Sequence, residues 1–324
     1  MLCTGARRGS GARAVYCRYM IFRHERKGCV WVDVEQPTMD ELRQVADEFS
    51  ISERLEAELF SPTPLPLLAH DERVALLVLH FPTEPEHDGD TKLQEVDFIV
   101  GPHFVITVRY EVVAPLHRLR KLFEADDALG HDRLEPDALL EILFAHLYAA
   151  ARDHATLTAA RLSRVERQMF SGQERETVRA ISTVSREFLH LEASIVNQRE
   201  PLARFFGAIA ERGFYGHGFP ERAKRIEAER EQAAHLAATY RAVAVELRET
   251  NASLIEASQN QIMRALTTIT VIVLPLELIA FVFGMHALGT PLENNPHAFW
   301  IIMAGMLATV GLMIAVFAKK RWIL

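Results

Sequence analysis

Cysteine is scarce in this chain of 324 residues, and the three that occur, Cys3, Cys17 and Cys29, all lie near the N-terminus. Their spacing is neither that of a zinc site nor that of the disulfide framework of a secreted domain. The simplest environment for these thiols is therefore a reducing cytosol.

An excess of positive charge is missing as well. Lys and Arg total 36 against 43 Asp and Glu, which gives a formal net charge of -7 at pH 7. This balance gives no reason to expect a nucleic-acid surface, and it is compatible with the binding of cations. The soluble part of the sequence also lacks a phosphate-binding loop, a nucleophile elbow and clustered metal ligands, which argues against an enzyme.

The first twenty residues lack an apolar core of the length that a signal peptide needs, although they carry several arginines. We expect residues 1–19 to form a disordered N-terminal tail, with Met20 as an alternative start of the protein.

Long apolar runs are present near the C-terminus. Residues 266–285, LTTITVIVLPLELIAFVFGM, contain one ionisable side chain, and residues 299–318, FWIIMAGMLATVGLMIAVFA, contain none. Each run is long enough to span a hydrocarbon core about 30 Å thick as a helix. Buried helices of a soluble protein are the alternative, but these seldom stay apolar on every face over this length. We predict two transmembrane helices, joined by an external loop at residues 286–298.

The flanking charges predict the orientation of these helices. Arg264 precedes the first run and residues 319–324 form a basic tail after the second, whereas the connecting loop contains no Lys or Arg. Both termini should therefore face the cytoplasm, and we expect a bacterial inner-membrane protein. In the external loop Glu293 is the single fixed charge and a candidate for attracting cations, while His297 is most simply a solvated side chain.

Residues 20–134 have the pattern of a cytoplasmic α/β domain. Short stretches rich in β-branched and aromatic residues predict strands at residues 29–34, 73–81, 95–100 and 103–110. A helix should begin after Thr38, because Glu41 three positions later completes a capping box. Residues 82–90, PTEPEHDGD, are typical of a hairpin loop.

Helical patterns dominate from residue 135 onward. Residues 135–219 should form a helical region with breaks near Ser171-Gly172 and across residues 213–220. No Pro or Gly then occurs before Pro275, which predicts one helix of about 55 residues and nearly 80 Å up to that proline. Its cytoplasmic part, residues 220–265, is the predicted stalk, and it enters the first span directly.

One stripe of the stalk recurs at alternating steps of four and three, which is the seam of a supercoiled bundle. The stripe consists of Leu236, Tyr240, Val243, Leu247, Thr250, Leu254, Ala257 and Gln261. It favours self-association, with packing on helices of the same subunit as the alternative. Two spans per subunit cannot enclose a pore unless subunits combine.

A second stripe carries polar groups into the first span. It consists of Asn260, Met263, Thr267, Thr270, Leu274 and Glu277. In a symmetric bundle each position becomes a ring, and rings of amide, hydroxyl and carboxylate oxygens can bond the water shell of a divalent cation. Glu277 is the most informative residue of this stripe, because an ionisable side chain inside a membrane span usually has a functional role. The alternatives are a glutamate that bonds a neighbouring helix, and threonines that bond their own helix carbonyls.

The stretch NQIMRALTTITVIVLPLELIAFVFGMH, followed by a short loop and a second span ending KKRWIL, resembles the CorA family of divalent metal ion transporters. The resemblance extends upstream through WVDVEQPTMDEL and ELRETNASLIEASQNQIM. It implies an α+β membrane protein that assembles as a homopentamer, with a cytoplasmic α/β funnel domain and a stalk helix that becomes the pore-lining span. The family's pore-lining positions correspond to Asn260, Met263, Leu266, Thr270, Leu274 and Glu277. Leu266 and Thr267 are adjacent, and either could face the axis.

The resemblance also places Gly284, Met285 and His286 at the family's Gly-Met-Asn signature, at the outer mouth of the pore. Two positions depart from the family pattern: His286 replaces the signature asparagine, and Glu277 stands where a neutral polar residue is usual. Imidazole can bind a transition metal or titrate near neutral pH. The candidate metal ligands are therefore His286, Glu277 and Asn260.

These observations give three hypotheses of function. The first is transport of divalent cations, magnesium above all, with cobalt or nickel as further ions. The second is zinc transport of the ZntB type, with or without coupling to protons, which the loop after His286 resembles. The third is a membrane scaffold or sensor that does not transport. No catalytic cofactor is expected; the divalent cation is the transported ion and a candidate regulatory ligand, and the partners are further copies of the chain and the lipid bilayer.

Overall fold

The computed structural model describes residues 21–26, 28–82, 93–127, 134–284 and 296–319. The predicted N-terminal tail, most of the predicted hairpin loop, Met285, His286, Glu293 and the end of the basic tail lie outside the described residues. The chain forms two compact units. The first contains Met1–Gln168 and Arg179–Glu246, and the second contains Met169–Val178 and Leu247–Leu324.

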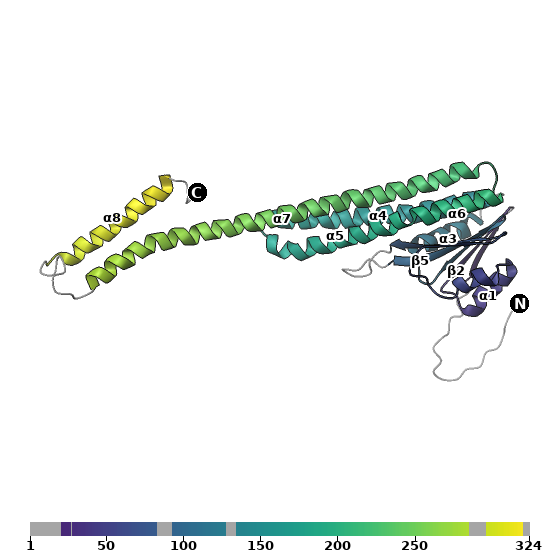
Figure 1. Cartoon of the computed structure of the whole chain (residues 1–324), viewed down its shortest axis with the longest axis horizontal. Helices are drawn as coiled ribbons and strands as arrows, with labels where there is room; N and C mark the ends of the chain where they lie inside the picture. The colour runs from purple at the N-terminus through teal and green to yellow at the C-terminus, as the bar shows by residue number, and fades with distance from the viewer. Residues whose placement is uncertain (1–20, 27, 83–92, 128–133, 285–295, 320–324) are drawn as a thin grey trace, which may run out of the picture. The chain divides into compact units, whose positions relative to one another are not determined.

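A six-stranded mixed sheet forms the centre of the first unit (Figure 1). The strands are β1 (Ile21–Arg26), β2 (Cys29–Glu35), β3 (Leu67–His70), β4 (Ala75–Pro82), β5 (Leu93–Gly101) and β6 (Phe104–Arg109). Their order is β1-β2-β6-β5-β4-β3, with β2 and β6 parallel and every other pair antiparallel. The apolar runs in β4, β5 and β6 are buried on both faces, which requires helices on both sides of the sheet.

The four predicted strands are present as β2, β4, β5 and β6, and β4 pairs antiparallel with β5, as a hairpin requires. The sequence pattern missed β1 and β3, which are the two edges of the sheet. β1 reads IFRHER and carries four charged or titratable side chains, whereas β3 has four residues. Short, charged strands are typical of sheet edges, where they discourage pairing with other chains, and they lack the alternation that identifies a strand.

One face of the sheet is covered by α1 (Met39–Glu48) and α2 (Glu53–Glu58). The capping box of α1 is confirmed: Glu41 N donates to Thr38 Oγ1 over 3.3 Å, and Thr38 N donates to Glu41 Oε2 over 2.8 Å. Leu42 and Leu55 of these helices share a buried core with Ile99 and other apolar residues of the sheet. After β6 the chain continues into α3 (Ala114–Asp127).

The long helices α4 (Pro136–Phe170) and α6 (Arg199–Arg212) pack on the other face. The helical layer also contains α5 (Glu174–Asn197) and the first part of α7 (Phe219–Gly284). Phe144 of α4 stacks on Phe98 of β5 with ring centroids 4.6 Å apart, and it also contacts Phe206 of α6. The predicted breaks are confirmed, and Gly213, with φ of 64°, ends α6 in a left-handed conformation. The break at Gln198 was missed; its signal is Pro201, which the first turn of a helix tolerates and the interior does not.

The predicted stalk is part of α7, which runs without a break from Phe219 to Gly284. The face of α7 that is buried in the single chain includes Ile226, Ala233 and Ala237, and of the predicted seam it includes Leu247, which is 7% exposed. On the seam Tyr240 contacts Phe188 of the same chain. A neighbouring seam residue, Val243, keeps 42% of its surface exposed in the single chain.

The second unit contains the apolar helices. It comprises the end of α4, the start of α5, α7 from Leu247 onward and α8 (Ala298–Lys319). Asn251 is buried and donates to the Glu174 carbonyl over 3.0 Å. Both α7 and α8 contain a segment that is long and apolar enough to cross a membrane.

Candidate cation path

The two apolar segments expose large hydrophobic side chains in the single chain. Leu274 and Phe281 of α7 are 63% and 71% exposed, and Trp300 of α8 is 69% exposed. None of the side chains in either apolar window is buried. Apolar surface of this extent is covered by lipid or by further copies of a chain in a stable protein. The segments are thus not core helices of this chain's own soluble domain, and their length and apolarity suit membrane spans.

We call the row of predicted pore residues on α7 the candidate path. It comprises Asn260, Met263, Leu266, Thr267, Thr270, Leu274 and Glu277, and all of them are exposed in the single chain. They belong to one helix and, counting Leu266 and Thr267 as alternatives at one position, recur at steps of three and four, so they follow one side of it.

A different side of this part of α7 is half-buried in the single chain. Its members are Thr268, Ile272, Pro275, Leu276, Ile279 and Phe283. Met263, Thr270 and Leu274 lie away from that side, which leaves the candidate path open to a partner or to water. The described residues of the chain therefore leave the path uncovered.

Both threonines of the candidate path bond to their own helix. Thr267 Oγ1 donates to the Met263 carbonyl over 2.8 Å, and Thr270 Oγ1 donates to the Leu266 carbonyl over 2.9 Å. This is the local bonding that hydroxyls in helices commonly adopt. Since the hydroxyl hydrogen is engaged, each threonine presents only the lone pairs of its oxygen outward. An acceptor without a competing donor suits the water shell of a cation, whose hydrogens point away from the metal.

Glu277 lies two positions after Pro275, in the apolar part of α7. Pro275 has no N–H, so the Val271 carbonyl lacks the donor that would normally close that turn. Within the described residues no three His, Cys, Asp or Glu side chains are placed to hold a metal ion. A cation at Glu277 would therefore need ligands from further copies of the chain or water molecules.

The mouth residues are only partly described. Gly284 is the last residue of α7, whereas Met285, His286 and Glu293 fall outside the described residues. His297 precedes α8, and its carbonyl accepts from Trp300 N and Ile301 N over 3.1 and 3.2 Å. The backbone of His297 thus begins the second apolar helix.

Sequence reasoning missed a network of buried charges in the first unit. Arg109 is fully buried and donates to Asp33 over 2.6 and 3.1 Å and to Glu35 over 2.9 Å. Thr107 Oγ1 donates to the same Asp33 carboxylate over 2.7 Å. The parallel pairing of β2 with β6 brings these residues together, because Asp33 stands opposite Thr107 and Glu35 opposite Arg109. The network ties the sheet together and contains no free ligand for a cation.

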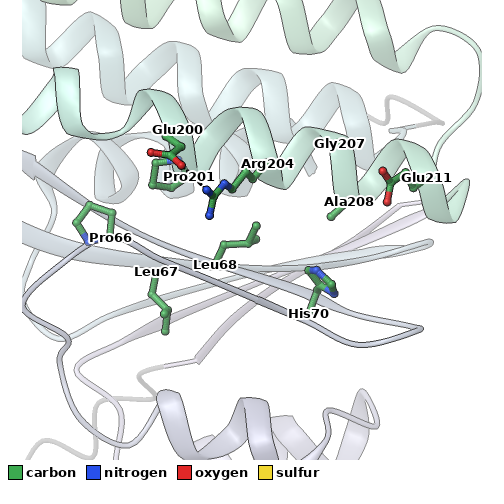
Figure 2. Close-up of a pocket in the computed structure, with 10 residues that line it drawn as sticks. All are labelled: Pro66, Leu67, Leu68, His70, Glu200, Pro201, Arg204, Gly207, Ala208 and Glu211. Atoms are coloured by element: carbon green, nitrogen blue, oxygen red, sulfur yellow. Dashed lines mark hydrogen bonds and ion pairs between the residues drawn. The ribbon is translucent and has the colours of Figure 1, made fainter.

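A groove of about 720 Å³ lies between the edge strand β3 and α6 (Figure 2). Leu68 and His70 of β3 face Arg204 and Gly207 of α6 across it. Arg204 pairs with Glu200 of its own helix, and Arg212 donates to His70 Nδ1 over 2.6 Å. With these groups already paired, the groove does not assemble a set of metal ligands.

The single described cysteine of the core, Cys29, is 3% exposed. Burial, and then the charge of Asp137, raise the pKa of its thiol to about 12. A thiol of this kind is an inert core side chain rather than a metal ligand or a nucleophile.

Within the described residues two helices are long and apolar enough to cross a bilayer, which places the chain in the class of membrane proteins. The family model described as CorA-like Mg2+ transporter protein matches residues 26–321, and the chain belongs to that family. The predicted resemblance to CorA proteins is thereby confirmed, as is the prediction that the chain is a member of a transporter family and not an enzyme.

Individual relatives agree with this assignment. The cobalt/magnesium transport protein CorA of Methanocaldococcus jannaschii is 23% identical over 305 residues, which cover 91% of this chain and 91% of that protein. The complete structure of the CorA magnesium transporter from Methanocaldococcus jannaschii has a TM-score of 0.78 at 21% identity, covering 91% of this chain and 92% of that one. The ZntB cytoplasmic domain from Vibrio parahaemolyticus RIMD 2210633 has a TM-score of 0.54 at 11% identity, covering 71% of this chain and 88% of that one. These likenesses confirm the predicted fold: a mixed α/β domain, long helices and two C-terminal apolar helices.

Proposed function

We propose that the chain transports divalent metal cations across the bacterial inner membrane through an axial pore that α7 lines in a homo-oligomer. Magnesium is the first candidate ion, with cobalt and nickel as further substrates. The observation that carries the proposal is the row of oxygen acceptors at Asn260, Thr270 and Glu277, exposed on one side of a membrane-spanning helix. Membership of a transporter family supports it.

The candidate path becomes a pore only when several chains surround one axis. Each acceptor then forms a ring that can bond the waters of a hydrated cation, while Met263 and Leu274 form apolar constrictions between the rings. The exposed seam residue Val243 supports assembly through α7. Five subunits is the number that the family resemblance implies.

The orientation follows from the flanking charges, with both termini in the cytoplasm. Cations would gather near Glu293, meet the ring of Gly284 to His286, and pass Glu277 and Leu274 before leaving near Asn260. A neutral imidazole keeps one donor and one acceptor and can replace the signature amide in holding water. Protonated His286 would repel dications, so uptake should fall in acid.

Zinc is the second candidate ion, and His286 is the feature that favours it. Imidazole binds zinc and its neighbours in preference to magnesium, which takes oxygen ligands. The likeness to a ZntB cytoplasmic domain concerns the fold of the soluble part, so the argument for zinc depends on His286 itself.

The test is cation uptake into proteoliposomes that contain the purified full-length chain, compared for magnesium, zinc, cobalt and nickel at two pH values. Flux dominated by magnesium supports the first candidate, whereas flux confined to zinc and its neighbours makes imidazole the selective group. The variant His286→Asn should lose the acid dependence. An absence of flux in correctly assembled protein would leave the scaffold as the better description.

A further inference from the structure

A cluster of titratable side chains lies on the face of the sheet that α1 and α2 cover. His80 of β4 stands opposite Glu95 of β5, and Asp97 follows Glu95 by two positions on the same face. Their neighbours Val78 and Ile99 belong to the core shared with α1 and α2. All three titratable side chains are largely withdrawn from water, and Asp97 has no exposed surface.

Glu95 has the partners that a carboxylate needs. Thr63 N donates to its Oε2 over 2.7 Å, and Thr63 Oγ1 donates to its Oε1 over 3.2 Å. His80 Nε2 lies 3.6 Å from Glu95 Oε2 and donates to the Thr63 carbonyl over 2.8 Å. Two donors and a nearby imidazole stabilise the negative charge of Glu95.

Asp97 lacks such partners. Its Oδ1 is buried without a hydrogen bond, and its Oδ2 lies 3.3 Å from the Tyr110 hydroxyl. That hydroxyl has one hydrogen, and the Leu59 carbonyl, only 2.7 Å away, can do nothing but accept it. The Tyr110 oxygen is then left as an acceptor toward Asp97, and only a protonated Asp97 can donate to it. Burial without a donor strongly disfavours the charged carboxylate relative to the neutral acid.

We infer that Asp97 is a neutral carboxylic acid that, together with Glu95 and His80, forms a proton-binding site of the cytoplasmic domain. Among the described residues, the titratable groups that act on Asp97 are Glu95 from its own strand and Tyr110 after β6, while Glu95 acts on His80 from the neighbouring strand. The C-cap residue of α2 contributes the Leu59 carbonyl, and the segment before β3 contributes Thr63.

The electrostatics agree with this assignment. Burial, and then the charge of Glu95, raise the pKa of Asp97 well above its ordinary value. The Glu95 carboxylate, whose Oε2 lies 3.6 Å from His80 Nε2, raises the pKa of His80. Because both folded-state values are raised, the stabilisation from these protons is complete below the unfolded-state pKa values and is lost as the pH rises through the folded-state values.

The site is connected to the helical layer through the backbone of His80. Gln198, which precedes α6, donates its side-chain amide to the His80 carbonyl over 2.7 Å. The Gln198 side-chain oxygen accepts from the Tyr148 hydroxyl of α4 over 2.8 Å. Loss of the Asp97 proton would place two negative carboxylates on adjacent same-face positions of β5. Repulsion between these carboxylates would distort β4 where the His80 carbonyl accepts from Gln198. The proton state of Asp97 therefore controls how tightly α6 is held.

Infrared spectroscopy of the full-length protein in lipid nanodiscs tests the protonation state directly. At neutral pH the variant Asp97→Asn should lose one buried carboxylic-acid C=O band relative to the unchanged chain. The control Asp47→Asn, at an exposed position of α1, should lose carboxylate intensity instead. Loss of carboxylate intensity in Asp97→Asn would overturn the assignment. If Asp97→Asn does not fold, the variant Tyr110→Phe provides the test, because it should shift the C=O band of the carboxylic acid. A shift confined to carboxylate bands would overturn the inference.

Hydrogen exchange tests the coupling to α6. After correction for the intrinsic effect of pH, peptides covering β4 and the start of α6 should exchange faster at alkaline than at neutral pH in the unchanged chain. The increase should be at least several-fold smaller in Asp97→Asn and unchanged in Asp47→Asn. Equal increases in Asp97→Asn and the unchanged chain would overturn the coupling.

Discussion

Thr270 Oγ1 donates to the carbonyl of Leu266, 2.9 Å away, inside the apolar part of α7. Thr268, two positions earlier, makes the same bond to the Arg264 carbonyl over 2.9 Å. The two hydroxyls therefore have equal local bonding, but Thr270 belongs to the candidate path and Thr268 to the half-buried side of the helix. A difference in cation uptake between variants at Thr270 and Thr268 therefore reports on the path rather than on the stability of the helix.

The variant Thr270→Val should lower cation uptake, because it removes one oxygen acceptor from every subunit around the axis. A lost hydrogen bond costs about 1 kcal/mol, which corresponds to a reduction of roughly five-fold in rate. Uptake into proteoliposomes measures this effect. Thr268→Val is the control and should transport normally; equal loss in both variants would show that the hydroxyls matter only to the helix.

The variant Glu277→Gln should lower the uptake of dications more than Thr270→Val does, since a ring of carboxylates attracts a cation by charge as well as by hydrogen bonds. We expect a reduction on the order of ten-fold, equivalent to about 1.4 kcal/mol. Glu256→Gln, on the exposed surface of α7 before the span, is the matched control. Unchanged flux in a fully assembled Glu277→Gln protein would remove this residue from the path.

Replacing the buried Arg109 should destabilise the cytoplasmic domain. Arg109→Leu leaves Asp33 and Glu35 buried without their main cationic partner, a change that typically costs 3–5 kcal/mol. Chemical denaturation, followed by a probe of the sheet, measures the loss. The control Lys224→Leu removes an exposed partner of Glu221 and should change stability little. Similar denaturation midpoints for Arg109→Leu and Lys224→Leu would contradict the structural role of the buried network around Arg109.

Cys29 should resist alkylation in the folded protein. With a thiol pKa of about 12, its thiolate fraction at pH 8 is lower than that of an unfolded cysteine by roughly a thousand-fold. Labelling with iodoacetamide before and after denaturation, followed by mass spectrometry of the Cys29 peptide, measures the ratio. Rapid labelling of the native protein would mean that this part of the sheet opens readily.

The membrane helices and the long α7 could be predicted from the sequence because their signals are local. An apolar run of sufficient length has one stable state in a bilayer, and the absence of Pro and Gly from the stalk leaves nothing to end the helix. The capping box of Thr38 and Glu41 is equally local. The edge strand β3 and the break at Gln198 have weaker local signals, and the tertiary structure defines them.

The buried polar clusters could not be predicted, because strand order brings their members together. Asp33 and Arg109 are 76 positions apart and meet only because β2 pairs with β6. Asp97 appears in the sequence as one of two acids in a mostly apolar strand, and its neutral state depends on Tyr110 and Leu59 from other elements. The position of the candidate path beside the axis of an oligomer stays a prediction, because that axis exists only when several chains assemble.

The most direct test of the path is chemical block of uptake at single introduced cysteines. In a chain whose three native cysteines are replaced, Leu274→Cys places a thiol on the candidate path, and Ile272→Cys places one on the half-buried side of the same helix. Divalent-cation uptake into proteoliposomes is measured before and after a bulky, water-soluble thiol reagent is added. We predict that the reagent blocks uptake through Leu274→Cys and leaves Ile272→Cys active. Equal sensitivity of the two variants, or uptake that no position on the path affects, would contradict a cation route along this side of α7.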